Sequence, residues 1–167
     1  MEIRLAQQHE LPILEQLARA IWPSTYSDII SLEQINYMLD WMYSTPALSQ
    51  QQQNGHEFYL LSEKGTDLGF LALEWMQPDQ SNEIHIIKIN KLYVLPQEQQ
   101  KGLGSALIHK AIERAEQTQV TKIILQVNKA NTAQYFYKKL GFVVQKEAVF
   151  EIGNGFVMDD YIMELSL

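Results

Sequence analysis

Two glycines one residue apart, Gly102 and Gly104, stand at the junction between a strand-like run and a helix-like run. The upstream run, KINKLYVLP, is rich in strand-forming residues and ends at Pro96. Downstream, residues 103–119 place apolar side chains on one helical face, and TKIILQV (121–127) predicts another strand. Two strands joined by a helix in this way form a right-handed parallel crossover. The chain is therefore expected to contain a parallel pair of strands.

The segments on either side of this unit predict antiparallel strands and amphipathic helices. Further strands are expected over residues 2–6, 56–63, 67–76, 83–95, 142–150 and 156–165, the last two joined by a hairpin at Gly153-Asn154-Gly155. One helix is expected from Pro12 to Pro23, one beginning at Ser31, and one from Asn131 to Leu140. Residues 49–55 (SQQQQNG) are interpreted as a helix end and a loop. The pattern predicts an α+β (mixed α/β) fold with one mostly antiparallel mixed sheet around a central parallel βαβ unit.

Composition and charge narrow the class of protein. At 167 residues, with 46% hydrophobic and 20% charged residues, the chain is expected to form one domain over residues 1–167. Its net charge of -7 argues against a nucleic-acid partner and is compatible with a cationic substrate. Because cysteine is absent, thiolate metal sites and a cysteine nucleophile are excluded, and no metal is expected. Without a signal-peptide pattern or an apolar run near the roughly 20 residues that span a bilayer, a cytoplasmic protein with no membrane partner is expected.

The glycine pair leaves two interpretations open. A P-loop needs Gly-Lys-Ser/Thr after a four-residue gap, and a dinucleotide-binding turn needs a small residue where Leu107 stands, so neither motif is present. One remaining interpretation is a loop whose N–H groups face a diphosphate at a helix N-terminus, with Lys101 adding positive charge. The other is a tight strand-to-helix turn without a ligand. The pair alone does not decide between them.

A second motif decides the question. The pattern QxxGxG at Gln99–Gly104 is followed by NxAxxFYxKxGF at Asn131–Phe142. Together they resemble the GNAT superfamily of acetyl-CoA-dependent N-acetyltransferases, and the resemblance covers essentially the whole chain. It implies a GNAT-like fold with helices on both faces of the sheet and acetyl-CoA as the co-substrate. The small bacterial members with an IWPxTY-like first helix, some of which look like polyamine acetyltransferases, are the most similar.

The resemblance also implies a set of cofactor contacts. Backbone groups of Leu92, Tyr93 and Val94 would bind the pantetheine arm. Amides of a second segment would hold the pyrophosphate: Gln99, Gln100, Lys101, Gly102, Leu103, Gly104 and Ser105. Asn131 would contact the pantetheine or the diphosphate, Lys139 or its neighbour Lys138 would lie near the nucleotide phosphates, and the Tyr137 hydroxyl would lie near the sulfur.

Acetyl transfer to an amine needs a neutral nitrogen, a polarised carbonyl and a proton for the thiolate. Tyr137 is the expected general acid, and a backbone N–H near Val94 is expected to polarise the carbonyl. Many family members carry a glutamate where this chain has Lys88, which leaves the base unassigned. If Met76 pairs with Glu83, Glu74 falls opposite His85, and this acid and imidazole are candidates for a base or proton relay. A surface pair, with water leading to bulk, is the alternative.

The family places acceptor recognition in the first two helices and the last hairpin. In this chain those segments carry aromatic and acidic residues, with Trp22, Tyr26, Asp159 and Asp160 as the candidate substrate contacts. Aromatic rings and carboxylates suit an alkylammonium or a polyamine, although core aromatics and solvated acids would give the same pattern. The expected partner is a small-molecule amine. The alternatives are a protein or peptide N-acetyltransferase and a catalytically silent acetyl-CoA-binding module, and a homodimer is left open.

Overall fold

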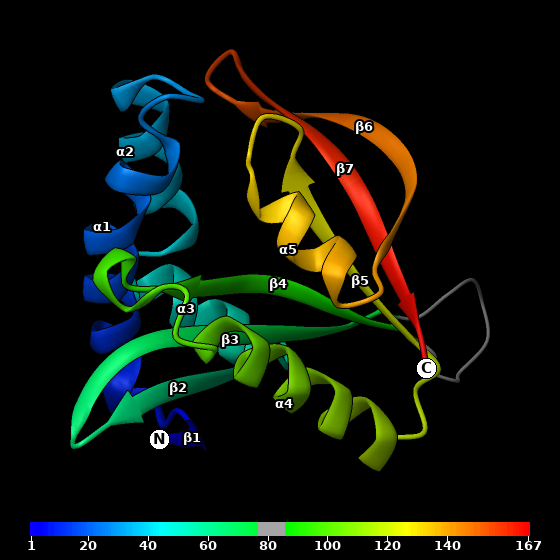
Figure 1. Cartoon of the computed structure of the whole chain (residues 1–167). Helices are drawn as coiled ribbons and strands as arrows, with labels where there is room; N and C mark the ends of the chain where they lie inside the picture. The colour runs from blue at the N-terminus through cyan, green and yellow to red at the C-terminus, as the bar shows by residue number, and fades with distance from the viewer. Residues whose placement is uncertain (77–85) are drawn as a thin grey trace.

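The fold is built around one β-sheet, with the helices packed against it (Figure 1). The computed structural model describes residues 1–76 and 86–167, and in these residues seven strands run in the order β1-β2-β3-β4-β5-β7-β6. The strands are β1 (Glu2–Leu5), β2 (Glu57–Glu63), β3 (Thr66–Met76), β4 (Ile86–Val94), β5 (Lys122–Asn128), β6 (Val143–Gly153) and β7 (Phe156–Ser166). The helices are α1 (Leu11–Tyr26), α2 (Leu32–Met42), α3 (Thr45–Gln53), α4 (Leu103–Gln117) and α5 (Ala133–Lys139). No helix in these ranges is long and apolar enough to span a bilayer.

The predicted parallel crossover is confirmed. β4 and β5 pair in parallel, from Ile86 opposite Lys122 to Ile89 opposite Leu125, and α4 connects them. The other strand pairs of the sheet are antiparallel. This mixed sheet with helices on both faces is the predicted fold class.

The parallel pair diverges partway along its length. Pairing ends at Ile89 and Leu125, yet β4 continues to Val94 and β5 to Asn128. Figure 1 shows the two strands separating beyond this point. On the opposite edge of β4, a bulge leaves Asn90 between Ile89, which pairs with Leu73, and Lys91, which pairs with Ala72. Because of the bulge, the side chains that follow Asn90 point to the opposite faces of the sheet from those that strict alternation would give them. These side chains include residues of the candidate site.

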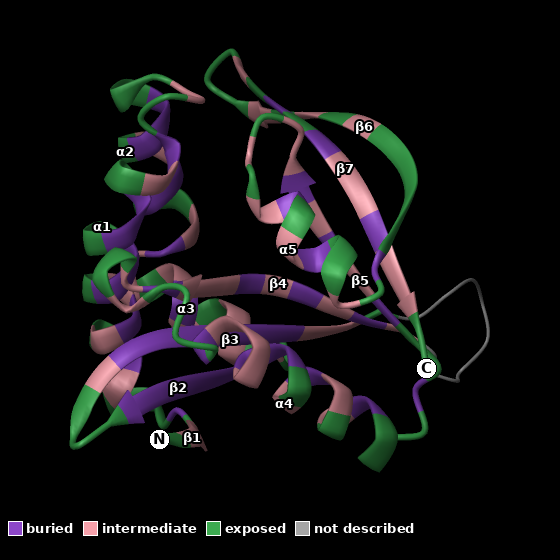
Figure 2. Cartoon of the chain, viewed as in Figure 1, coloured by how far each residue is buried: buried purple, intermediate pink, exposed green. Residues whose placement is uncertain are grey.

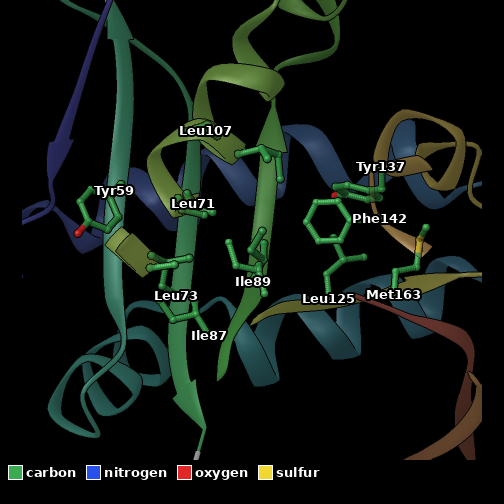
Figure 3. Packing of buried hydrophobic residues seen from close by; sticks show 14 of the residues in the cluster. Tyr59, Leu71, Leu73, Ile87, Ile89, Leu107, Leu125, Tyr137, Phe142 and Met163 are labelled. Atoms are coloured by element: carbon green, nitrogen blue, oxygen red, sulfur yellow. The ribbon is translucent and has the colours of Figure 1, made fainter. Parts of the chain in front are cut away.

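Each face of the sheet carries its own core. One core packs α4 and α5 against the sheet, with Leu107 and Tyr137 beside Ile89 and Leu125 (Figure 3). The other packs α1, α2 and α3 against side chains such as Phe58 on the opposite face. Figure 2 shows the buried residues concentrated in the central strands, while β6 at the edge is largely exposed. The divergent part of β4 therefore lies between two packed layers that hold it in place.

The N-terminal helices differ from the prediction in two respects. Pro23 was expected to end the first helix, but α1 continues to Tyr26. The hydroxyls of Ser24 and Thr25 donate to the Ile21 carbonyl, and buried Tyr26 packs in the core, so the last turn is held despite the proline. Residues 49–55 are a helix end followed by a turn, as expected, but the helix is a separate third one, α3, which begins at Thr45 with Pro46 in its first turn.

The structure also bears on the predicted cap of the second helix and on the predicted pairing between the third and fourth strands. Ser31 caps α2 as expected, with its hydroxyl accepting a hydrogen bond from the Gln34 N–H at 3.1 Å. The predicted pairing of Met76 with Glu83 is wrong, because Met76 pairs with Ile86 and Glu74 therefore lies opposite Lys88. Met76 thus pairs three residues further along the chain than expected. His85 lies outside the described residues, so the Glu74–His85 relay has no support in the observed register.

Candidate active site

A cavity of about 760 Å³ opens where β4 and β5 diverge. Its walls come from α1, β4, β5, the turn before α4, and α5. Of the predicted cofactor residues, Leu92, Tyr93, Val94, Gln99, Gln100, Gly102, Gly104, Ser105, Asn131 and Tyr137 line it. Segments far apart in the sequence thus meet around one hollow, as the two motifs predicted.

The edge of β4 supplies free backbone groups to this cavity. Beyond Ile89 the strand has no partner on its β5 side within the described part of the chain. Leu92, Tyr93 and Val94 follow in the cavity wall, and the Val94 carbonyl accepts a 3.3 Å hydrogen bond from the Gln99 side chain. An unpaired strand edge can hydrogen-bond an extended amide-containing ligand as a further strand would. A pantetheine arm is such a ligand.

The glycine turn forms one end of the cavity. Gly102 has φ +82°, a left-handed conformation that favours glycine, and it caps α4. The first hydrogen bond into the helix runs from the Ala106 N–H to the Gly102 carbonyl, which leaves the three preceding N–H groups outside that ladder. With the helix dipole behind them, such N–H groups attract an anionic diphosphate. The turn fits the anion-binding interpretation.

Two residues of the predicted phosphate segment are placed differently. Lys101 is exposed and bonds Glu98 at 2.7 Å, and neither its backbone nor its side chain is in the cavity wall. Leu103 is buried in the core with α4. Lys139 is exposed at the end of α5 and also lies outside the wall. Neither Lys101 nor Lys139 is therefore in the cavity wall.

Tyr137, the predicted general acid, is buried beside the cavity. It is a buried residue of α5, its ring lies against Phe142 at 5.8 Å between centroids (Figure 3), and it lines the cavity. Burial raises the pKa of its hydroxyl to about 12, so the proton is retained at neutral pH. Asn131, just before α5, accepts a 2.9 Å bond from the Ala133 N–H through its side-chain oxygen, which leaves its amide N–H groups for a ligand.

The other end of the cavity is aromatic. Tyr26 and Tyr93 line it, and their hydroxyl oxygens are 3.1 Å apart, with the Tyr43 hydroxyl donating to Tyr93 at 3.2 Å. Trp22 packs against Tyr26 in a tilted arrangement with 4.3 Å between ring centroids, but it is buried in the core and is not part of the wall. Of the two predicted aromatic contacts, only Tyr26 can touch a ligand in the cavity.

The predicted Asp159–Asp160 pair does not act as a pair. Successive strand residues point to opposite faces: Asp159 is exposed and bonds Lys129 at 2.7 Å, while Asp160 is 7% exposed. One carboxylate oxygen of Asp160 is buried with no hydrogen-bond partner in the described residues. Burial and the neighbouring Asp159 raise the pKa of Asp160 to about 6. Neither aspartate is in the wall of this cavity.

Sequence reasoning missed Lys91, a buried lysine in the cavity wall. Its Nζ donates to the side-chain oxygens of Gln51 at 2.6 Å and Asn90 at 2.7 Å, and burial lowers its pKa to about 7. Asn90 and Gln126 also line the cavity without having been predicted. The alternation of β4 gave no signal for Lys91, because its inward facing depends on the bulge at Asn90.

These features define a class of protein. A mixed sheet whose central parallel strands diverge around a cavity, with a glycine turn at the start of the crossover helix, is the architecture of an acyl-transferring domain that binds an extended, diphosphate-bearing donor. Residues 28–165 match the acetyltransferase (GNAT) domain family, and the chain belongs to that family. The predicted family, fold and enzyme class are confirmed.

Comparison with known proteins gives the same family. The chain is 33% identical over 105 residues to an uncharacterised N-acetyltransferase of Methanocaldococcus jannaschii, covering 61% of this chain and 44% of that protein. It is 35% identical over 78 residues to one of Mycobacterium tuberculosis, covering 46% and 49%. The chain thus spans about half the length of the curated relatives it matches.

Solved structures match over nearly the whole chain. The PaiA N-acetyltransferase of Thermoplasma acidophilum, in complex with coenzyme A, is 27% identical with a TM-score of 0.81, covering 99% of this chain and 98% of that one. The ribosomal-protein-S18-alanine N-acetyltransferase of Escherichia coli is 18% identical with a TM-score of 0.73, covering 99% and 92%, and that likeness concerns the fold alone.

Proposed function

We propose that this chain transfers the acetyl group of acetyl-CoA directly to a primary amine. The observation that carries the proposal is the cavity bounded by the unpaired edge of β4 and the glycine turn before α4. The coenzyme A bound by the Thermoplasma relative supports the choice of donor. Bound there, acetyl-CoA would supply an activated thioester.

The residues around the cavity would have separate roles. Backbone groups of Leu92 and Val94 would hold the pantetheine arm as an added strand, and N–H groups at the start of α4 would bind the diphosphate. Tyr137 would donate its proton to the departing sulfur. With no cysteine to carry an acyl group, the amine would attack the thioester directly.

The acceptor is proposed to be a small cationic amine, such as a polyamine. Tyr26 lies in the cavity wall, and Asp160 is a buried carboxylate whose free oxygen would gain a partner by binding an ammonium. Asp159, which bonds Lys129, is not part of the proposed acceptor site. The acetylation of a protein N-terminus is the second candidate, and a catalytically silent acetyl-CoA-binding module is the third.

A panel of acceptors distinguishes the three. Free CoA release would be measured with diamines, polyamines, amino acids and short peptides, beside calorimetry with acetyl-CoA. Preference for polyamines, with Michaelis constants that increase with salt as charges are screened, supports the proposal. Preference for peptides without a salt effect would replace the acceptor while retaining the reaction. Binding of acetyl-CoA without turnover of any acceptor would identify a silent module.

A further inference from the structure

Lys91 combines three properties that are rare together. It is 2% exposed, it belongs to the wall of the cavity, and no carboxylate in the described residues forms an ion pair with its Nζ. Its two partners are neutral amide oxygens, from Gln51 on α3 and from Asn90 on β4. Burial of a lysine without a countercharge is costly for the ammonium form, so the site favours a neutral amine.

The hydrogen bonds of Lys91 also leave one position on its nitrogen free. A neutral amine has two N–H groups and one lone pair, and the two N–H groups are taken by Gln51 and Asn90. The lone pair is then available to accept a proton. In the ammonium form the third N–H would have no acceptor among the described residues. The nitrogen is therefore arranged to receive a proton and then to release it.

The carboxylate of Glu74 fixes this arrangement through Asn90. Asn90 donates from its side-chain nitrogen to Glu74 at 2.9 Å. Because a carboxylate can only accept, Glu74 turns the Asn90 amide so that its oxygen faces Lys91. His56 approaches the second Glu74 oxygen at 4.0 Å, on the wall of a separate hollow of about 680 Å³. The bulge at Asn90 brings these groups together on one face.

We propose that Lys91 is the general base of the acetyl transfer and that Glu74, acting through Asn90, is its positioning residue. This inference rests on the proposed function. Lys91 removes a proton from the acceptor ammonium, directly or through one water, and the neutral amine attacks the thioester carbon. The C–N bond forms, the C–S bond breaks, and the Tyr137 proton goes to sulfur. The tyrosinate then takes the second proton of the new amide nitrogen, and Lys91 returns its proton to solvent, so that one proton is released per turnover.

The charges around Lys91 agree with this role. Burial is the main cause that lowers the pKa of Lys91 to about 7; Glu74 on β3 raises it and Lys88 on β4 lowers it. The remaining titratable neighbours are Tyr43 after α2, whose ring lies 5.0 Å from Nζ, and His56 before β2, beyond Glu74. Burial raises the pKa of Tyr43 and lowers that of His56, so near neutral pH both are uncharged groups. Glu74 is the one acid of this network.

The first test replaces Lys91 with methionine, which fills the same space and removes a buried amine, so that folding is retained. We expect Lys91→Met to bind acetyl-CoA with unchanged affinity and to lose on the order of 10²-fold or more in kcat near neutral pH. Trimethylamine, which has no N–H and cannot be acetylated, should restore part of the rate. The matched control is Lys122→Met, which removes an exposed lysine paired with Glu164. Equal turnover of the two variants would overturn the proposal.

The second test follows the proton itself. In protein labelled with carbon-13 at lysine Cε, one resonance should titrate near pH 7 in the absence of any donor or acceptor, and it should vanish in Lys91→Met. The wild-type kcat should rise with pH to a plateau, with the same apparent pKa as this resonance. The kcat of Lys91→Met should lack this rise with pH. If acetyl-CoA binds and amines are acetylated while Lys91 titrates in the normal range of about 10, the base assignment fails and the proposed function stands. If no amine is acetylated, the proposed function fails whatever the titration shows.

Glu74→Gln tests the positioning role. Loss of the negative charge should lower the pKa of Lys91, so the acidic limb of kcat should move to lower pH. A glutamine side chain can also donate a hydrogen bond to Asn90, so the Asn90 amide would no longer be held with its oxygen toward Lys91. The plateau value of kcat should therefore fall. Glu74→Asp, which keeps an acceptor, should restore much of the plateau. A Glu74→Gln profile with the wild-type limb and plateau would show that Glu74 is not a positioning residue.

Discussion

Gly104 at the start of α4 and Phe136 in α5 face each other so closely that a β-carbon at position 104 would lie 3.2 Å from the Phe136 ring. Both residues line the cavity. The contact joins the two sequence motifs in space, since one motif supplies the glycine and the other supplies the ring. It also means that a larger residue at 104 must displace either the ring or the ligand.

The first prediction follows from this contact. Gly104→Val should weaken acetyl-CoA binding by at least on the order of 10-fold, because the branched side chain displaces Phe136 and blocks approach to the first N–H groups of α4. Calorimetry measures the affinity. His109→Val, which introduces the same side chain at an exposed position of the same helix, should bind normally. Equal affinities for the two variants would contradict the placement of the diphosphate.

The second prediction concerns the proposed general acid. Tyr137→Phe should retain cofactor affinity and lose on the order of 10²-fold in kcat, because only the hydroxyl proton is removed. Since burial raises the pKa of Tyr137 to about 12, wild-type activity should show no loss from tyrosine ionisation below about pH 11. Tyr135→Phe is the matched control, two residues away on the same helix and 60% exposed. A kcat for Tyr137→Phe equal to that of the control would reduce Tyr137 to packing.

Most of the fold could be predicted because its signals are local. The apolar periodicity of α4 and the β-branched runs around it are sufficient for the parallel crossover. The last turn of α1 could not be predicted, because it is held by hydroxyl bonds and by tertiary packing of Tyr26 that override Pro23. The register of Glu74 depends on the length of the connection between β3 and β4, which short-range pattern does not set.

The candidate site likewise contains residues that local sequence motifs predict and residues whose placement depends on tertiary structure. The glycine turn and Tyr137 belong to contiguous motifs and lie in the cavity as predicted, although their roles remain predictions. Lys91 was missed because a bulge determines its facing, and a bulge forms only against a partner strand. The separation of Asp159 from Asp160 could have been foreseen from strand alternation alone. The burial of the Asp160 carboxylate could not, because it depends on tertiary packing that strand alternation does not set.

A third prediction concerns the attachment of α4 to the sheet. Arg114 binds Glu57 with two parallel hydrogen bonds, from Nε at 2.9 Å and from Nη2 at 2.7 Å, and both side chains are partly buried. Arg114→Lys should lower the free energy of unfolding by about 1 kcal/mol, since a lysine cannot reproduce the bidentate geometry. Thermal unfolding should show a decrease of about 2–4 °C. Arg19→Lys, at a more exposed pair, should have little effect, and equal shifts would contradict the argument.

A fourth prediction concerns Asp160 and pH. Its folded pKa of about 6 lies above its unfolded value of about 3.9, so the unfolded state releases the proton first as pH rises. Folding stability should therefore fall between about pH 4 and pH 6, by at most about 3 kcal/mol at roughly 1.4 kcal/mol per pKa unit. Asp160→Asn should remove this loss, so the variant should unfold at a higher temperature than wild type near neutral pH and lose that advantage below about pH 4.

The same substitution tests the acceptor. If the buried carboxylate binds an ammonium, Asp160→Asn should raise the Michaelis constant for a polyamine more than it lowers kcat, because the interaction is made in the ground state. A cationic acceptor should also stabilise wild type more than the variant, since it supplies the partner that the Asp160 oxygen lacks. Asp159→Asn, at the exposed neighbour bound to Lys129, should change neither quantity much. A higher unfolding temperature for Asp160→Asn with an unchanged Michaelis constant would leave Asp160 as a buried structural carboxylate and would remove it from the acceptor site.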